Sequence, residues 1–137
     1  WDFGRVDYGT RVSAKTPGVL KWTCGDPSEG CSFVDDQQVE YDTWEDNEIV
    51  VKRFHVRASN HRLIPFGIDY NADRMVIVKT VAKRTGLPLL CDTHTENENI
   101  PQGEMSCSAD VGPDTWLSLY FDTKKELTTV EIYTAYL

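Results

Sequence analysis

The segment at residues 50–62, VVKRFHVRASNHR, carries the side chains best suited to chemistry. Side chains of a strand alternate between its two sides, so a strand here would place Val51, Arg53, His55 and Arg57 on one side. The two-residue repeat spaces such side chains about 7 Å apart. The segment therefore predicts a row of hydrogen-bond donors along one side of a strand.

Two interpretations of this row lead to different functions. As a binding surface for a partner, it would use Arg53, His55, Arg57 and the nearby Arg62. As the active site of a small secreted hydrolase, most plausibly a ribonuclease, it would use His55 and His61 to move protons and Arg57 to hold the phosphate. A plain solvated strand face whose bases offset nearby acids is the simplest alternative to both.

A second polar segment lies between Cys91 and Cys107, where Asp92, His94, Glu96, Glu98 and Glu104 follow at short spacing. Alternating oxygen ligands are typical of calcium loops, but the EF-hand pattern is absent. We expect a hydrated acidic loop that can serve in recognition. The sequence predicts neither a metal site nor a cofactor.

Composition limits the classes of partner. The 137 residues carry 14 Lys and Arg against 22 Asp and Glu, a formal net charge of -8. Such a surface repels phosphate backbones and anionic lipids, which makes a nucleic-acid partner unfavourable. No apolar run reaches the roughly 20 residues that a membrane-spanning helix needs. An unknown protein or surface partner remains, and the oligomeric state stays open.

The four cysteines indicate the compartment. Their spacings lack the short pairs of zinc sites, so we expect disulfides and an extracellular location. Cys24 with Cys31 and Cys91 with Cys107 each bracket a turn-rich loop, and we expect these pairs, although two other connectivities are open. The chain begins with Trp1 and lacks an apolar leader, as expected of a secreted protein whose signal peptide has been removed.

Turn signals recur every eight to fifteen residues and predict a single domain over residues 1–137, made of short strands. The expected strands are residues 10–15, 19–24, 38–42, 49–57, 63–69, 116–121 and 127–136. In the second of these, alternation places Leu20, Trp22 and Cys24 on one buried face. The last two expected strands, residues 116–121 and 127–136, would form a hairpin through the linker DTKKE.

One segment has helical end signals. Asn71 opens it, Lys83 and Arg84 lie in its last turn, and Gly86 and Pro88 follow. Met75, Val78 and Ala82 would lie on one face of this helix. We therefore predict a mainly β fold, a small disulfide-stapled β-barrel or sandwich with one helix near residues 72–85.

The stretch at residues 10–24, TRVSAKTPGVLKWTC, resembles the approach to the first cysteine in the Alternaria major-allergen family. That family shows I-K-A…G-x-L-x-F-T-C, and the matching positions here are Val12, Ala14, Gly18, Leu20, Trp22, Thr23 and Cys24. The loop between the first two cysteines is shorter than in the family, and no cysteine serves the family's intermolecular bridge. The resemblance implies a fungal secreted β-barrel, also with two local disulfides, that acts as an effector-type binder of host components without catalytic residues.

Overall fold

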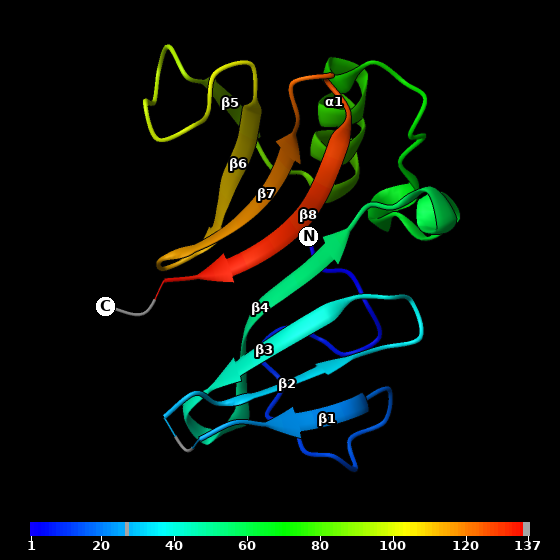
Figure 1. Cartoon of the computed structure of the whole chain (residues 1–137), viewed down its shortest axis with the longest axis vertical. Coiled ribbons are helices and arrows are strands. Elements are labelled where there is room, and N and C mark those ends of the chain that lie inside the picture. The colour runs from blue at the N-terminus through cyan, green and yellow to red at the C-terminus, as the bar shows by residue number, and fades with distance from the viewer. Residues whose placement is uncertain (27, 136–137) are drawn as a thin grey trace.

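The computed structural model describes residues 1–26 and 28–135. Within them, eight antiparallel strands form one sheet in the order β1-β2-β3-β4-β8-β7-β6-β5 (Figure 1). The strands are β1 (Leu20–Cys24), β2 (Cys31–Val34), β3 (Glu40–Trp44), β4 (Glu48–His55), β5 (Leu90–Thr93), β6 (Met105–Gly112), β7 (Thr115–Phe121) and β8 (Leu127–Thr134). The mainly β class is confirmed.

The sheet is built from two sets of strands. One set contains β1 to β4 and the other contains β5 to β8, and they meet where β4 pairs with β8. After β4 the chain leaves the sheet through two 3-10 turns, η2 (Ala58–Leu63) and η3 (Pro65–Gly67), and then through α1 (Arg74–Thr85). It re-enters at the far edge as β5 and returns strand by strand until β8 pairs with β4. Among the described residues β1 and β5 are the two edges, and the sheet does not close into a barrel.

The predicted helix is confirmed as α1, and its end signals explain its limits. Gly86 follows the last turn with a positive φ of 73°, a conformation that glycine adopts without strain. The N-cap is Asp73, two residues after the expected start. The buried face is not the apolar face expected from the sequence, because Ile77, Val78 and Val81 point inward. Met75 is 46% exposed.

Several strand predictions needed correction. Residues 10–15 contribute only an isolated bridge between Arg11 and Glu48, and residues 63–69 form 3-10 turns. The short strands β2 and β5 and the longer β6 were missed. Residue 136 of the expected last strand lies outside the described residues. The hairpin between β7 and β8 is confirmed.

The first strand contains an irregularity that shifts its alternation. Leu20 pairs with Val34, and Thr23 pairs with Ser32. Val34 and Ser32 are two positions apart and face the same side, so Leu20 and Thr23 also face one side although they are three positions apart. Lys21, with a φ of 55°, absorbs the extra residue. Leu20 is consequently exposed, while Trp22 is half-buried and its ring stacks on Phe33 at 5.8 Å between centroids. The expected shared face of Leu20 and Trp22 was wrong.

The two faces of the sheet have different surroundings. One face, here called the inner face, carries the alternate buried side chains such as Phe54 of β4 and Val130 of β8, which lie opposite each other. Helix α1 and residues 1–12 cover this face, since their buried side chains belong to the same apolar cluster. In Figure 1 both lie behind the strands. The opposite face, called the outer face, has no covering layer among the described residues.

A charged group lies inside the core. Lys52 follows the alternation of β4 onto the inner face and is 0% exposed. Its ammonium donates to Asp2 Oδ1 at 2.6 Å and to the carbonyl oxygen of Phe3. Burial lowers the pKa of Lys52, and the hydrogen bond to Asp2 opposes this effect. The ammonium thereby ties the N-terminal segment to the middle of the sheet.

Tyr41 and Asp35 make a second polar attachment for the same segment. The Tyr41 hydroxyl donates to Asp35 Oδ2 at 2.6 Å and accepts the amide proton of Val6. Asp35 Oδ2 also accepts the amide proton of Arg5 at 2.8 Å. Burial, followed by the bond to Asp35, raises the pKa of Tyr41 far above its usual range. Residues 1–8 are therefore held by buried polar contacts as well as by apolar packing.

Both expected disulfides are present. Cys24 bonds to Cys31 and Cys91 bonds to Cys107, each joining neighbouring strands. Two disulfides of this kind suit an oxidising compartment. Among the described residues, no helix is long and apolar enough to cross a membrane.

Candidate functional site

The outer face brings together side chains from five strands in rows that run across the sheet. In the middle row, Arg53 of β4 lies between Glu40 of β3 and Glu131 of β8, and Ser118 of β7 follows. The next row toward one end contains His55, Thr129 and Tyr120. The row toward the other end contains Asp42, Val51, Tyr133, Trp116 and Asp110.

Arg53 is the centre of a polar network. Its Nε donates to Glu131 Oε2 at 2.7 Å, and its Nη1 lies 4.0 Å from Asp42 Oδ2. The Tyr120 hydroxyl donates to Glu131 Oε1 at 3.2 Å. Glu131 therefore joins β4 to β7 through side chains as well as through the backbone ladder. The network fixes the guanidinium in place and satisfies its charge.

The pKa values of these groups follow from burial and pairing. Burial disfavours the charged form of Arg53, but the hydrogen bond and charge of Glu131 outweigh it and raise its pKa. Burial, then the negative charge of Glu131, raises the pKa of Tyr120. Both groups therefore keep their protons throughout the physiological range.

His55 and Glu40 form a further polar contact on the outer face. His55 Nε2 lies 3.2 Å from Glu40 Oε2, and both side chains are partly exposed. A histidine beside a carboxylate can move a proton, so the pair has the elements of a general acid–base site. The nearest cation on the same side of β4, Arg53, is already bound by Glu131. Arg53 is therefore not free to hold a phosphate beside His55.

The structure separates the residues that the sequence analysis grouped. The alternation of Arg53 and His55 on one side of β4 agrees with the expectation. Arg57 lies past the end of β4, at the start of η2, and is exposed, as is Arg62. His61 stacks on Tyr70 with ring centroids 3.8 Å apart. Among the described residues, no hydrogen bond or ion pair joins His61 to His55.

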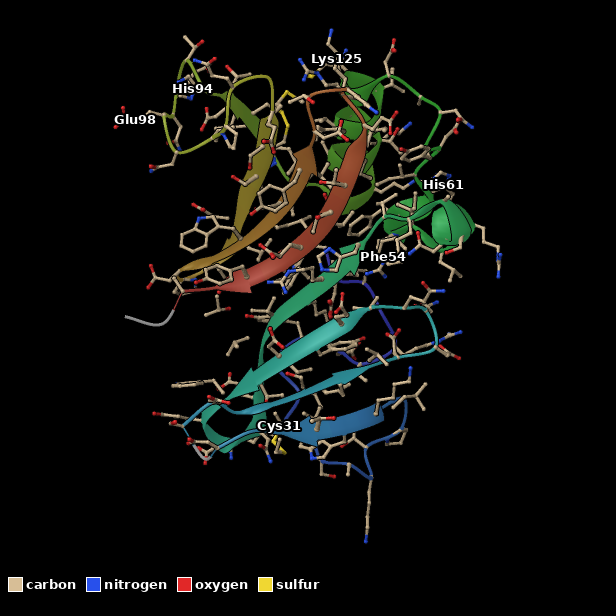
Figure 2. All side chains as sticks on the ribbon, in the orientation of Figure 1. Cys31, Phe54, His61, His94, Glu98 and Lys125 are labelled. Atoms are coloured by element: carbon tan, nitrogen blue, oxygen red, sulfur yellow. A yellow bond between two sulfur atoms is a disulfide. The ribbon has the colours of Figure 1, made fainter. Side chains whose placement is uncertain are left out.

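The polar residues expected between Cys91 and Cys107 lie in the loop that this disulfide closes. His94 Nδ1 lies 2.7 Å from the carbonyl oxygen of Ile100, within the loop closed by Cys91 and Cys107. Glu98 lies on the same loop, away from the outer face (Figure 2). In the described part of the chain, no group of three His, Cys, Asp or Glu side chains is arranged to hold a metal ion.

Exposed apolar side chains are spread over the outer face, from one edge of the sheet to the other. The described residues include seven exposed large apolar side chains, and by strand register four of them lie on this face: Leu20, Trp44, Leu90 and Tyr133. Tyr133 is 43% exposed and its ring is nearly parallel to that of half-buried Trp116, 6.5 Å away. Leu90 is 75% exposed.

Sequence reasoning missed most of these residues. Glu40, Glu131, Tyr120, Trp116 and Tyr133 were each within an expected strand, but their meeting depends on which strands are neighbours. The alternation of the expected strand at residues 127–136 could have indicated two of them, because it places Glu131 and Tyr133 on the side opposite to the apolar side chains of that strand. Comparison of the chain with family models, curated proteins and solved structures found no match.

Proposed function

We propose that the protein is a secreted, non-catalytic binding protein whose partner docks on the outer face of the sheet. The observation that carries the proposal is the aromatic pair of Trp116 and Tyr133 in the middle of an uncovered face, with further exposed apolar side chains toward its edges. Exposed apolar patches on a folded domain mark interaction sites, and Trp and Tyr are enriched among the residues that dominate binding energy. An effector-type role and a fungal source rest on the resemblance of residues 10–24 alone.

Charge on the outer face favours a basic protein as the partner. Six carboxylates lie on this face by register, contributed by Glu40, Asp42, Glu48, Asp92, Asp110 and Glu131. Arg53 is the cation of the middle rows and is paired with Glu131, and His55 lies beside Glu40. The face is therefore net negative, and a partner that presents Lys and Arg side chains around an apolar centre would be complementary.

Substitution of Trp116 and Tyr133 tests this proposal. The partner is captured from extracellular fluid on the immobilised protein and purified, and its Kd is then measured for each variant. We expect Trp116→Ala with Tyr133→Ala to weaken binding by about 2 kcal/mol or more, roughly 30-fold. Higher salt should weaken binding by the wild type.

Met75→Ala with Val76→Ala supplies the control, because these exposed side chains lie on α1, on the other side of the sheet. Their substitution should leave Kd within a factor of about two. A control that weakens binding as much as the outer-face pair, or the absence of any retained protein, would count against the proposal.

A ribonuclease is the second candidate, and the His55–Glu40 pair is the observation that favours it. This reading predicts cleavage of single-stranded RNA with a pH dependence set by His55, and loss of cleavage in His55→Ala. We expect no cleavage above a buffer control, because Arg53 is held by Glu131 and the face is acidic. Turnover that disappears in His55→Ala or His61→Ala would replace the binding proposal with an enzymatic one.

A further inference from the structure

A groove separate from the outer face lies at the beginning of α1. It has a volume of about 720 Å³ and opens between the start of α1 and the turn that joins β7 to β8. Arg74, Lys124 and Lys125 contribute its cationic side chains. A second hollow of about 450 Å³ adjoins it, since Arg74 and Lys125 also line that hollow, together with His94. Figure 2 shows Lys125 beside this end of α1.

The turn fixes the backbone that carries the two lysines. Asp122 Oδ1 accepts the amide protons of Lys124 at 2.9 Å and of Glu126 at 3.0 Å. The amide of Lys125 donates to the carbonyl oxygen of Asp122 at 3.0 Å. The backbone that carries the lysines is therefore ordered before any ligand arrives, which limits the entropy that binding would cost.

The cations of the groove are available to a ligand. Within residues 1–26 and 28–135, Arg74, Lys124 and Lys125 make no ion pair. Two carboxylates beside these cations accept hydrogen bonds from neutral groups, which do not cancel their charge: Glu126 accepts the Tyr70 hydroxyl at 2.7 Å, and Asp122 accepts the amides of the turn. The bond to Glu126 raises the pKa of Tyr70 to about 12. Asp73, the N-cap of α1, also lines the groove, and its side chain makes no capping hydrogen bond.

Local charge here is opposite to that of the whole protein. The chain has a net charge of -8, so anions are repelled from most of its surface. The groove is lined by three cations from two distant segments and by two carboxylates, Asp73 and Glu126, so the formal charge of its lining is +1. Charge-assisted hydrogen bonds from Arg and Lys to phosphate or sulfate oxygens are stronger than neutral ones. The amides of the first turn of α1 add donors, but the three side chains carry the argument.

We infer that this groove binds a small ligand bearing a tetrahedral oxyanion, either a phosphate ester or a sulfate ester. Arg74 would approach the oxyanion from the helix, and Lys124 and Lys125 from the turn. The site lies beyond the docking surface of the outer face, because α1 covers the inner side of the sheet. A ligand here and a partner there could bind together.

Titration of the whole protein with glucose 6-phosphate and with glucose 6-sulfate at low salt, followed by calorimetry, tests the inference. We expect saturable binding of at least one ester, and the tighter one identifies the ligand class. The variant carrying Arg74→Gln, Lys124→Gln and Lys125→Gln should bind more weakly by about tenfold or more.

A second variant has the same change in net charge away from the turn, with Lys15→Gln, Lys79→Gln and Lys83→Gln at exposed positions. It should bind with an affinity within about twofold of the wild type, since it keeps all three groove cations. An equal loss in both variants would show attraction to charge in general and would overturn the inference. Failure of the folded wild type to bind either ester would also overturn it.

Discussion

Asp2→Ala should lower the free energy of unfolding by about 3 kcal/mol, the lower end of the range for breaking a buried ion pair on one side. The reason is that the Lys52 ammonium, 0% exposed, loses its only carboxylate partner among the described residues. The lower end applies because Asp2 is itself 30% exposed and the carbonyl oxygen of Phe3 still accepts from Lys52. Chemical denaturation followed by tryptophan fluorescence measures the change.

Lys52→Met separates the ion pair from packing. Methionine keeps the apolar stem in the core, and removal of the charge makes Asp2 dispensable as a counter-ion. In the Lys52→Met background, Asp2→Ala should therefore cost much less than it does in the wild type. A double-mutant cycle with no coupling between the two positions would mean that Asp2 does not stabilise the ammonium.

Phe54→Ala is expected to have an effect of similar size or larger, about 3–5 kcal/mol. Phe54 is 0% exposed and lies opposite Val130, where β4 joins β8 and the two sets of strands meet. The cavity left by the ring would therefore weaken contacts on both sides of that junction. Leu90→Ala, at a site 75% exposed, should change stability by about 0.5 kcal/mol or less.

Thermal and denaturant unfolding of both variants measure this difference. A Phe54→Ala protein as stable as the wild type would show that the two sets of strands hold together without the ring. Loss of only part of the circular dichroism signal would indicate that the sets unfold separately, in contrast to the single core that the packing describes.

The sequence predicted local features well because they depend on neighbouring residues. Gly86 and Pro88 stop α1 through backbone conformation, and the alternation around Arg53 and His55 follows from the pleat of one strand. The same alternation places Lys52 beside Phe54 on the inner side. It could have indicated a buried lysine that needs a counter-ion.

Other features depend on contacts between distant segments, which no local pattern encodes. The pairing of β4 with β8 brings Glu131 to Arg53 across 78 positions of sequence. The bulge at Lys21 reverses the side that Leu20 faces. Arg57 does not continue the strand with Arg53 and His55, because Asn60 Oδ1 accepts its amide proton at 2.7 Å and the turn of η2 starts there. Each outcome followed from a tertiary or turn contact.

Hydroxyl-radical footprinting of the protein, free and bound to its purified partner, tests directly whether the partner docks on the outer face. Oxidation of Trp116, Tyr133 and Leu90 reports the outer face, and oxidation of Met75 reports the exposed side of α1. If the partner docks on the outer face, Trp116 and Tyr133 become protected on binding while Met75 is oxidised at the same rate. Protection of Met75 with unchanged oxidation of Trp116 and Tyr133 would contradict the account.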